Sequence, residues 1–352
     1  MKDILQIQTI RYLLLVFTAT HVGSCKINTN QYQVDTSSEN HGDTQSGEIQ
    51  YPTITFVEIP AGEFSFGSPA DTPCRAPIAE TQFNVQLTRS FEMAETEVTQ
   101  AQWESLGFPN PVKTSNDDEP IVFINFFEAL AWCNRLSALK GLDSCYNLST
   151  CTGDVGEGYP EDLPQSDEYG SWNAEFNFNC TGNIHKYSNY YLCPGYRLPT
   201  SAEWEYAAKA NTTTHTYGGD VQYVEAGSCA VQSSLEDIAW YCANSDGVIN
   251  PVKMKLSNSW GLYDTLGNVY EWTDYYFSGQ SLGNADENTT LTDPIGPPIG
   301  DNIEIRGGSF MECCYVRPSR PLSTRSYIRQ FDTGFRPVRT LFNDDAESDS
   351  QK

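Results

Sequence analysis

The eleven cysteines constrain the fold of this chain more than any other feature of its 352 residues. One of them, Cys25, follows an apolar run near the N-terminus and is treated separately below. The other ten form an even set, which in an exported chain predicts up to five disulfide bonds, although their spacing leaves the connectivity open. No two have the Cys-x-x-Cys spacing of zinc knuckles or thioredoxin-type redox sites. The ten candidates are Cys74, Cys133, Cys145, Cys151, Cys180, Cys193, Cys229, Cys242, Cys313 and Cys314.

Residues 1–24 have the pattern of a secretory signal peptide. Lys2 and Arg11 precede an apolar run over 12–20, which is too short to span a bilayer as a helix. The sequence Val-Gly-Ser-Cys that ends at Cys25 resembles a bacterial lipobox. We therefore expect Cys25 to be the lipid-bearing first residue of an exported chain, held at a membrane by this anchor alone. The alternative is an ordinary signal peptide cut nearby, with Cys25 left as an odd thiol.

Composition divides the rest of the chain into a tether, one domain and a tail. Residues 25–52 begin with the anchor cysteine and continue in Asn, Gln, Ser, Thr and Asp, which predicts a flexible tether. One domain is expected over 53–341, with a cysteine-rich insert at about 143–195. The cysteines of the insert predict structural staples, with a ligand-binding loop as the alternative. Residues 342–352 predict an acidic, solvated tail. The expected location is the cell envelope, or the medium if no lipid is attached.

The charge of the chain limits its partners. It carries 21 Lys and Arg against 46 Asp and Glu, a formal net charge of −25. Nucleic-acid binding is not expected, because phosphate contacts need basic patches. Only 4 histidines are present, so a multi-histidine metal site is not expected either. The Gly-x-Ser-x-Gly, His-Glu-x-x-His, Walker-type and EF-hand patterns are absent from the sequence.

Three helices are predicted from capping boxes, in which a polar N-cap residue is followed three positions later by Glu or Gln. The pairs are Thr99 with Gln102, Asn125 with Glu128, and Thr200 with Glu203. The helices are expected over roughly 100–107, 126–140 and 201–210. Residues 55–59 and 63–67 alternate in polarity around Pro60-Ala61-Gly62 and predict a β-hairpin. Short β segments broken by Gly, Pro and Asn dominate elsewhere, so the predicted fold is a large, loop-rich α+β domain stapled by disulfides.

Six motifs follow one another along residues 53–340. They are FVEIPAGEF at 56–64, ETEVT with Gln-Trp at 95–103, YRLPTSAEWEYA at 196–207, WGLYDTLGNVYEW at 260–272, RGGSF at 306–310 and GFR at 334–336. In this order they resemble the formylglycine-generating enzyme (sulfatase-modifying factor) family, in its exported bacterial form. The resemblance implies a variant of the C-type-lectin fold with few short helices and strands.

The resemblance also implies a chemistry, which this chain does not match. Catalytic members of the family oxidise a cysteine of a sulfatase peptide with oxygen, using copper held by two thiolates, ligands that select Cu(I). Counted without gaps from the Arg-Gly-Gly-Ser motif, the two cysteine positions fall on Arg317 and Leu322. With a three-residue deletion they fall on Cys314 and Ser319. In both alignments the second thiolate is missing, so no copper site is expected.

Adjacent cysteines cannot replace that pair. Two neighbouring residues cannot place their sulfur atoms on opposite sides of one metal without severe backbone strain. Cys313 and Cys314 are therefore expected to bond to distant cysteines. The nearby arginines at 317, 320, 325 and 329 either line a groove or lie in solvated salt bridges; the sequence does not favour one over the other.

A calcium site is implied by the segment over 260–272. In the family, one calcium ion is held by two side chains and two backbone carbonyls, which match Asp264 and Glu271 (side chains) and Gly267 and Val269 (carbonyls). Water would supply the remaining oxygens that calcium requires. The ion would pin a loop-rich fold; the alternative for the same residues is a hairpin turn beside a strand.

These observations favour an envelope binding or scaffold module without catalytic activity, whose ligand is a protein, a peptide or a glycan. The alternative is a divergent formylglycine-generating oxidase that acts on a protein cysteine through Cys314 and another thiol. A third possibility is a purely structural surface protein. A binding module is expected to have all ten domain cysteines paired, whereas an oxidase needs an accessible reactive thiol near Arg317.

Overall fold

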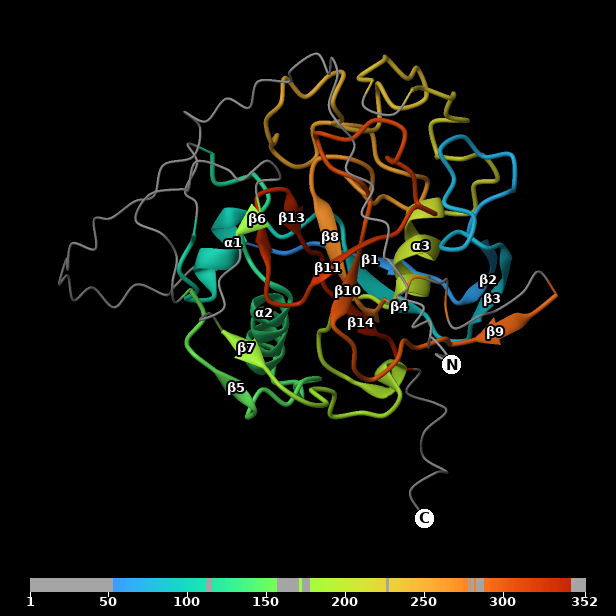
Figure 1. Ribbon diagram of the computed structural model, residues 1–352. Helices are drawn as coiled ribbons and strands as arrows, with labels where there is room; N and C mark the ends of the chain where they lie inside the picture. The colour runs from blue at the N-terminus through green and yellow to red at the C-terminus, as the bar shows by residue number, and fades with distance from the viewer. Residues whose placement is uncertain are drawn as a thin grey trace, which may run out of the picture.

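The computed structural model describes residues 53–111, 116–156, 171–172, 178–225, 228–277, 279, 282 and 288–342. The predicted signal peptide, Cys25, the tether and all but the first residue of the acidic tail lie outside these ranges. The described chain is α+β, as predicted, with short elements separated by long irregular segments (Figure 1).

The three predicted helices are confirmed. They are α1 (Gln100–Ser105), α2 (Phe126–Leu139) and α3 (Ser201–Lys209), with a short 3₁₀ helix at Tyr190–Leu192. Each α-helix begins at a complete capping box, in which the N-cap side chain accepts from the N3 amide and the N3 side chain accepts from the N-cap amide. The cap residues are Thr99, Asn125 and Thr200. The helix starts could be predicted because capping is a local interaction.

The strands are short and belong to several small sheets. They are β1 (Phe56–Ile59), β2 (Gly62–Phe66), β3 (Phe83–Leu87), β4 (Phe91–Ala94), β5 (Cys151–Thr152), β6 (Ser171–Trp172), β7 (Asn179–Cys180), β8 (Tyr270–Tyr276), β9 (Thr290–Thr292), β10 (Asn302–Arg306), β11 (Leu322–Arg325), β12 (Arg329–Gln330), β13 (Thr333–Gly334) and β14 (Val338–Thr340). Sheet orders are β1-β4-β14, β2-β3-β9 and β11-β10-β8-β13, with two-stranded pairs β12-β6 and β5-β7.

The predicted hairpin between β1 and β2 is wrong, although both strands form. β1 pairs with β4, and β2 pairs with β3, both antiparallel. The chain therefore continues from β1 into β2 without reversing, and it returns alongside them through β3 and β4. A two-residue hairpin turn needs positive φ angles, which Pro60 cannot adopt and which none of residues 60–62 has. The real reversal is the loop 67–82, which carries Cys74 and Glu80.

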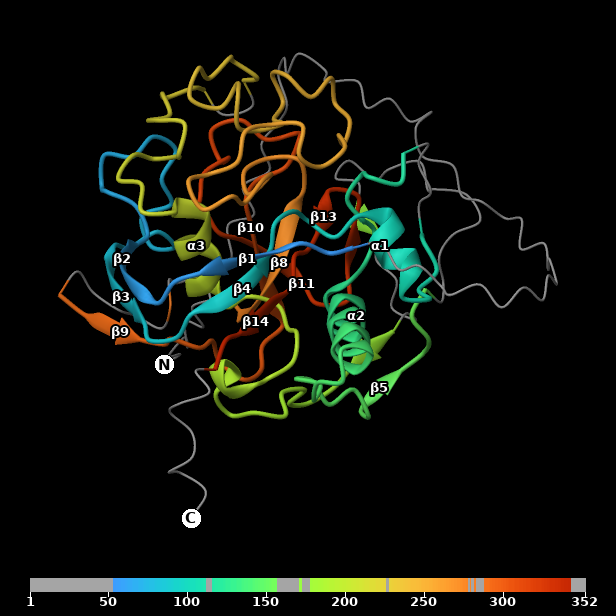
Figure 2. The same ribbon diagram turned by 180° about the vertical axis from the view of Figure 1, so that it is seen from behind.

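Strand β8 is the centre of the domain, and every one of its residues is buried. Its alternate side chains face opposite ways. Trp272 and Tyr276 pack in the core cluster that contains α2, whereas Glu271 bonds to Trp204 of α3. Figures 1 and 2 show α2 and α3 on opposite sides of this strand. The strand β8 therefore separates two hydrophobic cores.

One end of the molecule consists of loops only. Segments 67–82, 211–269 and 307–321 contain no helix or strand among their described residues, and they gather at the top of Figures 1 and 2. The copper and calcium positions that the resemblance implies lie in this region or where it meets the strands.

Three disulfides connect the described chain, fewer than the five that an even cysteine count allows. The bonds are Cys74–Cys314, Cys145–Cys193 and Cys151–Cys180, and the last two lie in the predicted cysteine-rich insert. Cys133, Cys229, Cys242 and Cys313 are thiols, so the expectation that all ten are paired is wrong. Cys133 is fully buried in α2, whereas Cys242 interacts with both Cys229 and Cys313. Among the described residues, no helix has the length and apolarity needed to cross a membrane.

Candidate functional site

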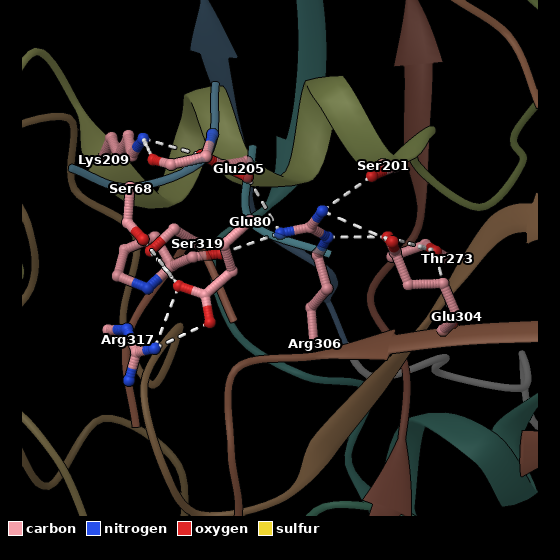
Figure 3. Close-up of polar contacts among 12 residues, drawn as sticks. Ser68, Glu80, Ser201, Glu205, Lys209, Thr273, Glu304, Arg306, Arg317 and Ser319 are labelled. Atoms are coloured by element: carbon pink, nitrogen blue, oxygen red, sulfur yellow. Dashed lines mark hydrogen bonds and ion pairs between the residues drawn. The ribbon is translucent and has the colours of Figure 1, made fainter. Parts of the chain in front are cut away.

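The first ungapped copper position is occupied by a buried arginine (Figure 3). Arg317 donates from Nη2 to both carboxylate oxygens of Glu80, at 2.7 and 2.9 Å. Its Nη1 donates to the carbonyl of Cys314 at 2.6 Å, and Nη2 also donates to the carbonyl of Cys74 at 3.0 Å. Neither charged side chain is exposed to solvent. The guanidinium is therefore held in place by protein oxygens.

Glu80 reaches this place from the loop between β2 and β3 and is enclosed by further partners. Its Oε2 accepts from the Ser68 hydroxyl at 2.7 Å, and its Oε1 accepts from the Ala76 amide at 2.8 Å. Arg320 lies 3.6 Å from Oε1. Ser319, the second position in the gapped alignment, is buried with its hydroxyl 3.5 Å from Oε2. Ser319 thus faces a carboxylate.

A second buried arginine lies beside the first (Figure 3). Arg306 donates from Nε to Glu304 at 2.6 Å and from Nη1 to Glu205 at 3.0 Å. Its Nη2 donates to the Ser201 hydroxyl at 2.8 Å, and Nη1 also reaches the carbonyl of Pro318 at 2.8 Å. The arginine of the Arg-Gly-Gly-Ser motif therefore ties α3 to the segment that follows β10. Because removing one partner of a buried pair leaves an uncompensated charge, the region is strongly specified.

Neither alignment of the copper positions yields a pair of thiolates. Cys314 is bonded to Cys74, and Leu322 is the half-buried first residue of β11. The remaining two positions hold a guanidinium, which has no acceptor, and a hydroxyl. These groups do not fit Cu(I), which selects soft thiolate or thioether ligands. Cys313 is a buried thiol next to the disulfide, and neither alignment places it at a copper position.

The predicted calcium residues lie where the loop region meets β8. Asp264 is buried, and its Oδ2 accepts from the Lys253 amide at 2.7 Å, while its Oδ1 has no hydrogen-bond partner. Glu271 is already engaged: Arg336 donates to both of its oxygens at 2.7 Å, and the Trp204 indole donates at 2.8 Å. The turn between them packs closely against Trp240, because a Cβ on Gly267 would lie 2.1 Å from the carbonyl oxygen of that residue.

A third carboxylate, missed from the sequence, lies in the same interior. Glu97 is fully buried, and neither of its carboxylate oxygens has a hydrogen-bond partner. Burial raises the pKa of Glu97 well above its ordinary value, and the charges of Asp264 and Glu271 raise it further. Burial likewise raises the pKa of Asp264 to about 6. The only sequence signal was an acidic residue directly before the buried Val98 and the helix cap.

These orphaned oxygens are compatible with a cation. Buried carboxylates without partners are unfavourable unless they are protonated or neutralised by a positive charge. No group of three or more His, Cys, Asp or Glu side chains in the described ranges is positioned to hold one metal ion. An ion bound at Asp264 would therefore need backbone carbonyls, such as those of Gly267 and Val269, and water.

A polar pocket of about 590 Å³ opens at the other end of the β10–β11 pair. Its lining residues are Asn179, Cys180, Gly300, Asp301, Asn302, Arg325, Ser326 and Tyr327. Of the four arginines considered for a groove, only Arg325 lines this pocket. Arg317 and Arg329 are buried in ion pairs with Glu80 and Glu128, and Arg320 is half-buried.

Comparison with known proteins gives two named relatives of different character. Chaperone protein LppX of Paenibacillus barcinonensis is 28% identical over 208 residues, which cover 54% of this chain and 63% of that protein. This chain thus spans less than two thirds of that relative. Formylglycine-generating enzyme of Streptomyces coelicolor is 27% identical over 270 residues, covering 72% of this chain and 78% of the enzyme.

Solved structures agree on the fold. Treponema denticola variable protein 1 superposes with a TM-score of 0.58 at 27% identity, over 84% of this chain and 99% of that one. PvdO from Pseudomonas aeruginosa has a TM-score of 0.55 at 19% identity, over 81% and 94% of the two chains, and supports the fold alone. The family model of the sulfatase-modifying factor enzyme 1-like domain matches residues 42–341. Because this match spans strand β8, both buried arginines and the loop region, the chain belongs to the sulfatase-modifying factor enzyme 1-like domain family.

Proposed function

We propose that this protein is an exported binding module of the cell envelope that has no copper-oxidase activity. The observation that carries the proposal is the Arg317–Glu80 pair, which fills the place where the resemblance puts the first copper thiolate. Cys314, the other candidate, is held in a disulfide. Four of the described cysteines are unpaired, contrary to the expectation for a binding module, but Cys313, the one nearest to Arg317 in the sequence, is buried and not the accessible thiol that an oxidase needs. The name of the Paenibacillus relative, a chaperone, supports binding rather than oxidation. The Streptomyces enzyme supports the oxidase alternative by its name alone, since the thiolate pair has no counterpart here.

The pocket beside β11 is the recognition site in this proposal. Arg325 is exposed, donates to the Tyr327 hydroxyl and lies with its guanidinium 5.9 Å from the centre of the Tyr327 ring. Asp301 and Asn302 offer acceptors and an amide across the pocket. This mixture of a cation, an aromatic ring and amide groups suits a hydroxyl-rich or carboxylate-bearing ligand, either a glycan or a peptide. Export and attachment through Cys25 belong to the same proposal.

Substitution in the pocket tests the binding role. Against arrays of bacterial glycans and of peptides from exported proteins, Arg325→Ala is expected to weaken binding at least about tenfold, because the residue supplies the pocket's cation. Arg135→Ala, on the exposed face of α2, should leave binding unchanged. Copper-dependent, oxygen-consuming conversion of a cysteine in a sulfatase-motif peptide would instead overturn the proposal in favour of the oxidase.

Calcium is proposed as the structural ion of the loop region, held by Asp264, Gly267, Val269 and Glu271. Calcium at about one hundred times its Kd is expected to raise the free energy of unfolding by about 2.7 kcal/mol. Asp264→Ala should abolish this calcium-induced increase, and Asp71→Ala, an exposed control, should preserve it. Urea unfolding of each variant with calcium and with a chelator measures the increase within that variant, so any baseline loss does not matter. Equal stability in the two conditions for the unsubstituted protein would contradict the site.

A further inference from the structure

Three thiols meet in the loop region, at a place that neither the binding pocket nor the calcium residues involve. We call Cys229, Cys242 and Cys313 the cysteine trio. The Cys242 thiol interacts with both the Cys313 and the Cys229 thiols, and Cys242 packs against the small cluster that contains Cys313. The backbone supports this meeting, since the Cys242 amide donates to the carbonyl of Glu312 at 2.9 Å. Two segments far apart in the sequence are thereby fixed with their sulfur atoms together.

The trio leads from the surface to the interior. Cys229 is exposed, Cys242 is half-buried, and Cys313 is buried. Cys313 packs with Cys314, and Cys74 and Cys242 contact the same small cluster. The innermost thiol therefore lies next to the Cys74–Cys314 disulfide. Cys229 is therefore the thiol most accessible to a reagent in solution, and Cys313 is the least accessible.

The trio differs from a structural disulfide because it contains an odd number of thiols. Three thiols of which the middle one neighbours the other two can form only one disulfide among themselves, so one thiol always remains. Cys242 touches both others, so it is the shared partner in either possible bond, Cys229–Cys242 or Cys242–Cys313. The fourth thiol of the domain, Cys133, is fully buried in the α2 core and takes no part.

The interactions between the thiols also give them different pKa values. The contact with Cys242 lowers the pKa of Cys313 to about 7, whereas the pKa of Cys242 is raised, chiefly by the same contact. Cys313 therefore has substantial thiolate character near neutral pH, and the thiolate is the attacking form in disulfide exchange. A low pKa also makes Cys313 a good leaving group in the reverse direction.

We propose that the cysteine trio is a thiol–disulfide exchange site whose substrates are disulfides and dithiols of other polypeptides. The Cys229 thiolate attacks a substrate disulfide, forming a mixed disulfide and releasing one substrate thiolate. The Cys242 thiol then passes its proton to the Cys313 thiolate beside it, and its sulfur attacks the sulfur of Cys229, forming Cys229–Cys242 and releasing the second substrate thiolate. The two protons of the protein thiols pass to the released sulfurs, so the substrate gains the two electrons that the trio loses.

An internal step then moves the bond inward. The Cys313 thiolate attacks the Cys242 sulfur, forming Cys242–Cys313 and regenerating the Cys229 thiolate with no net oxidation. The exposed thiol is thus restored while the bond is stored in the interior. Running the sequence backwards against a substrate dithiol returns the trio to its reduced form and leaves a disulfide in the substrate.

Glutathione disulfide is the probe for the test, applied to the full mature chain with Cys25→Ser in every sample to remove the N-terminal thiol. Acid-quenched samples are mapped by mass spectrometry. We expect glutathione to be attached to Cys229 first, and the disulfides Cys229–Cys242 and Cys242–Cys313 to appear next. The final ratio of these two disulfides should be the same whichever of them is present at the start. Cys229→Ser should slow the loss of thiols at least tenfold, and Cys313→Ser should stop at Cys229–Cys242. Cys133→Ser is the matched control and should behave as the parent.

Two results would overturn the proposal. One is a single pairing that never interchanges, which would make it a structural disulfide; the other is a Cys229 that does not react. Exposure of Cys229 makes its serine variant safe for folding, and the retained Cys74–Cys314 bond reports the native state in every map. The assay is independent of the pocket, because no substitution touches Arg325, so failure here and failure of the binding proposal can be told apart.

Discussion

Replacing Arg317 by methionine is expected to lower the free energy of unfolding by about 3–5 kcal/mol, the typical loss when one partner of a buried ion pair is removed. The reason is the carboxylate left behind. Glu80 is fully buried, and its carboxylate would keep the Ser68 and Ser319 hydroxyls, the Ala76 amide and the more distant Arg320 as partners. Urea unfolding with an unchanged m-value would measure the loss.

Two further variants separate charge from packing. Arg317→Met combined with Glu80→Gln should recover part of the loss, because the uncompensated charge is gone while an amide oxygen remains for the Ala76 amide. Arg339→Met is the matched control, since its pair with Glu92 is partly exposed at 2.8 Å and should contribute no more than about 1 kcal/mol. A loss at Arg317 no larger than that at Arg339 would contradict a structural role for the buried Arg317–Glu80 pair. The two residues would then be candidates for a functional site.

Local interactions explain why the helices could be predicted. Each capping box spans four residues, and all three were found where the sequence placed them. The family resemblance extended this to the fold, since its motifs surround strand β8. The pairing of β1 and β2 was wrong because the alternation of polarity shows a strand but not its partner, which here lies about thirty residues further along the chain.

The site residues depend on long-range contacts and were predicted less well. The ungapped alignment placed Arg317 at one copper position but could not predict its partner, because Glu80 lies 237 positions away in a loop without a distinctive pattern. Glu97 lay inside a recognised motif, yet only its burial beside Asp264 gives it a meaning. The cysteine trio shows the same limit, since an even count predicted pairs and the fold brought three thiols together.

Removal of the Cys74–Cys314 disulfide is the second large expected effect. The bond joins residues 240 positions apart, whereas Cys151–Cys180 joins residues 29 positions apart. If a disulfide acts mainly by restricting the unfolded chain, the longer loop contributes about 5.5 kcal/mol and the shorter about 3.6 kcal/mol. The double variant Cys74→Ala/Cys314→Ala should therefore lose more stability than Cys151→Ala/Cys180→Ala, by about 2 kcal/mol.

Non-reducing urea unfolding of both double variants at acidic pH measures that difference. Acidic pH matters because the remaining thiols could otherwise form new disulfides during the experiment, and the thiolate is the attacking form in exchange. An equal loss in the two variants would mean that loop length does not control the effect and that native contacts around each bond dominate. A larger loss at Cys74–Cys314 would show that this bond holds the loop after β2 against the segment where the resemblance places the copper ligands. The Arg317–Glu80 pair joins the same two segments, so a disulfide and a buried ion pair would stabilise one contact independently.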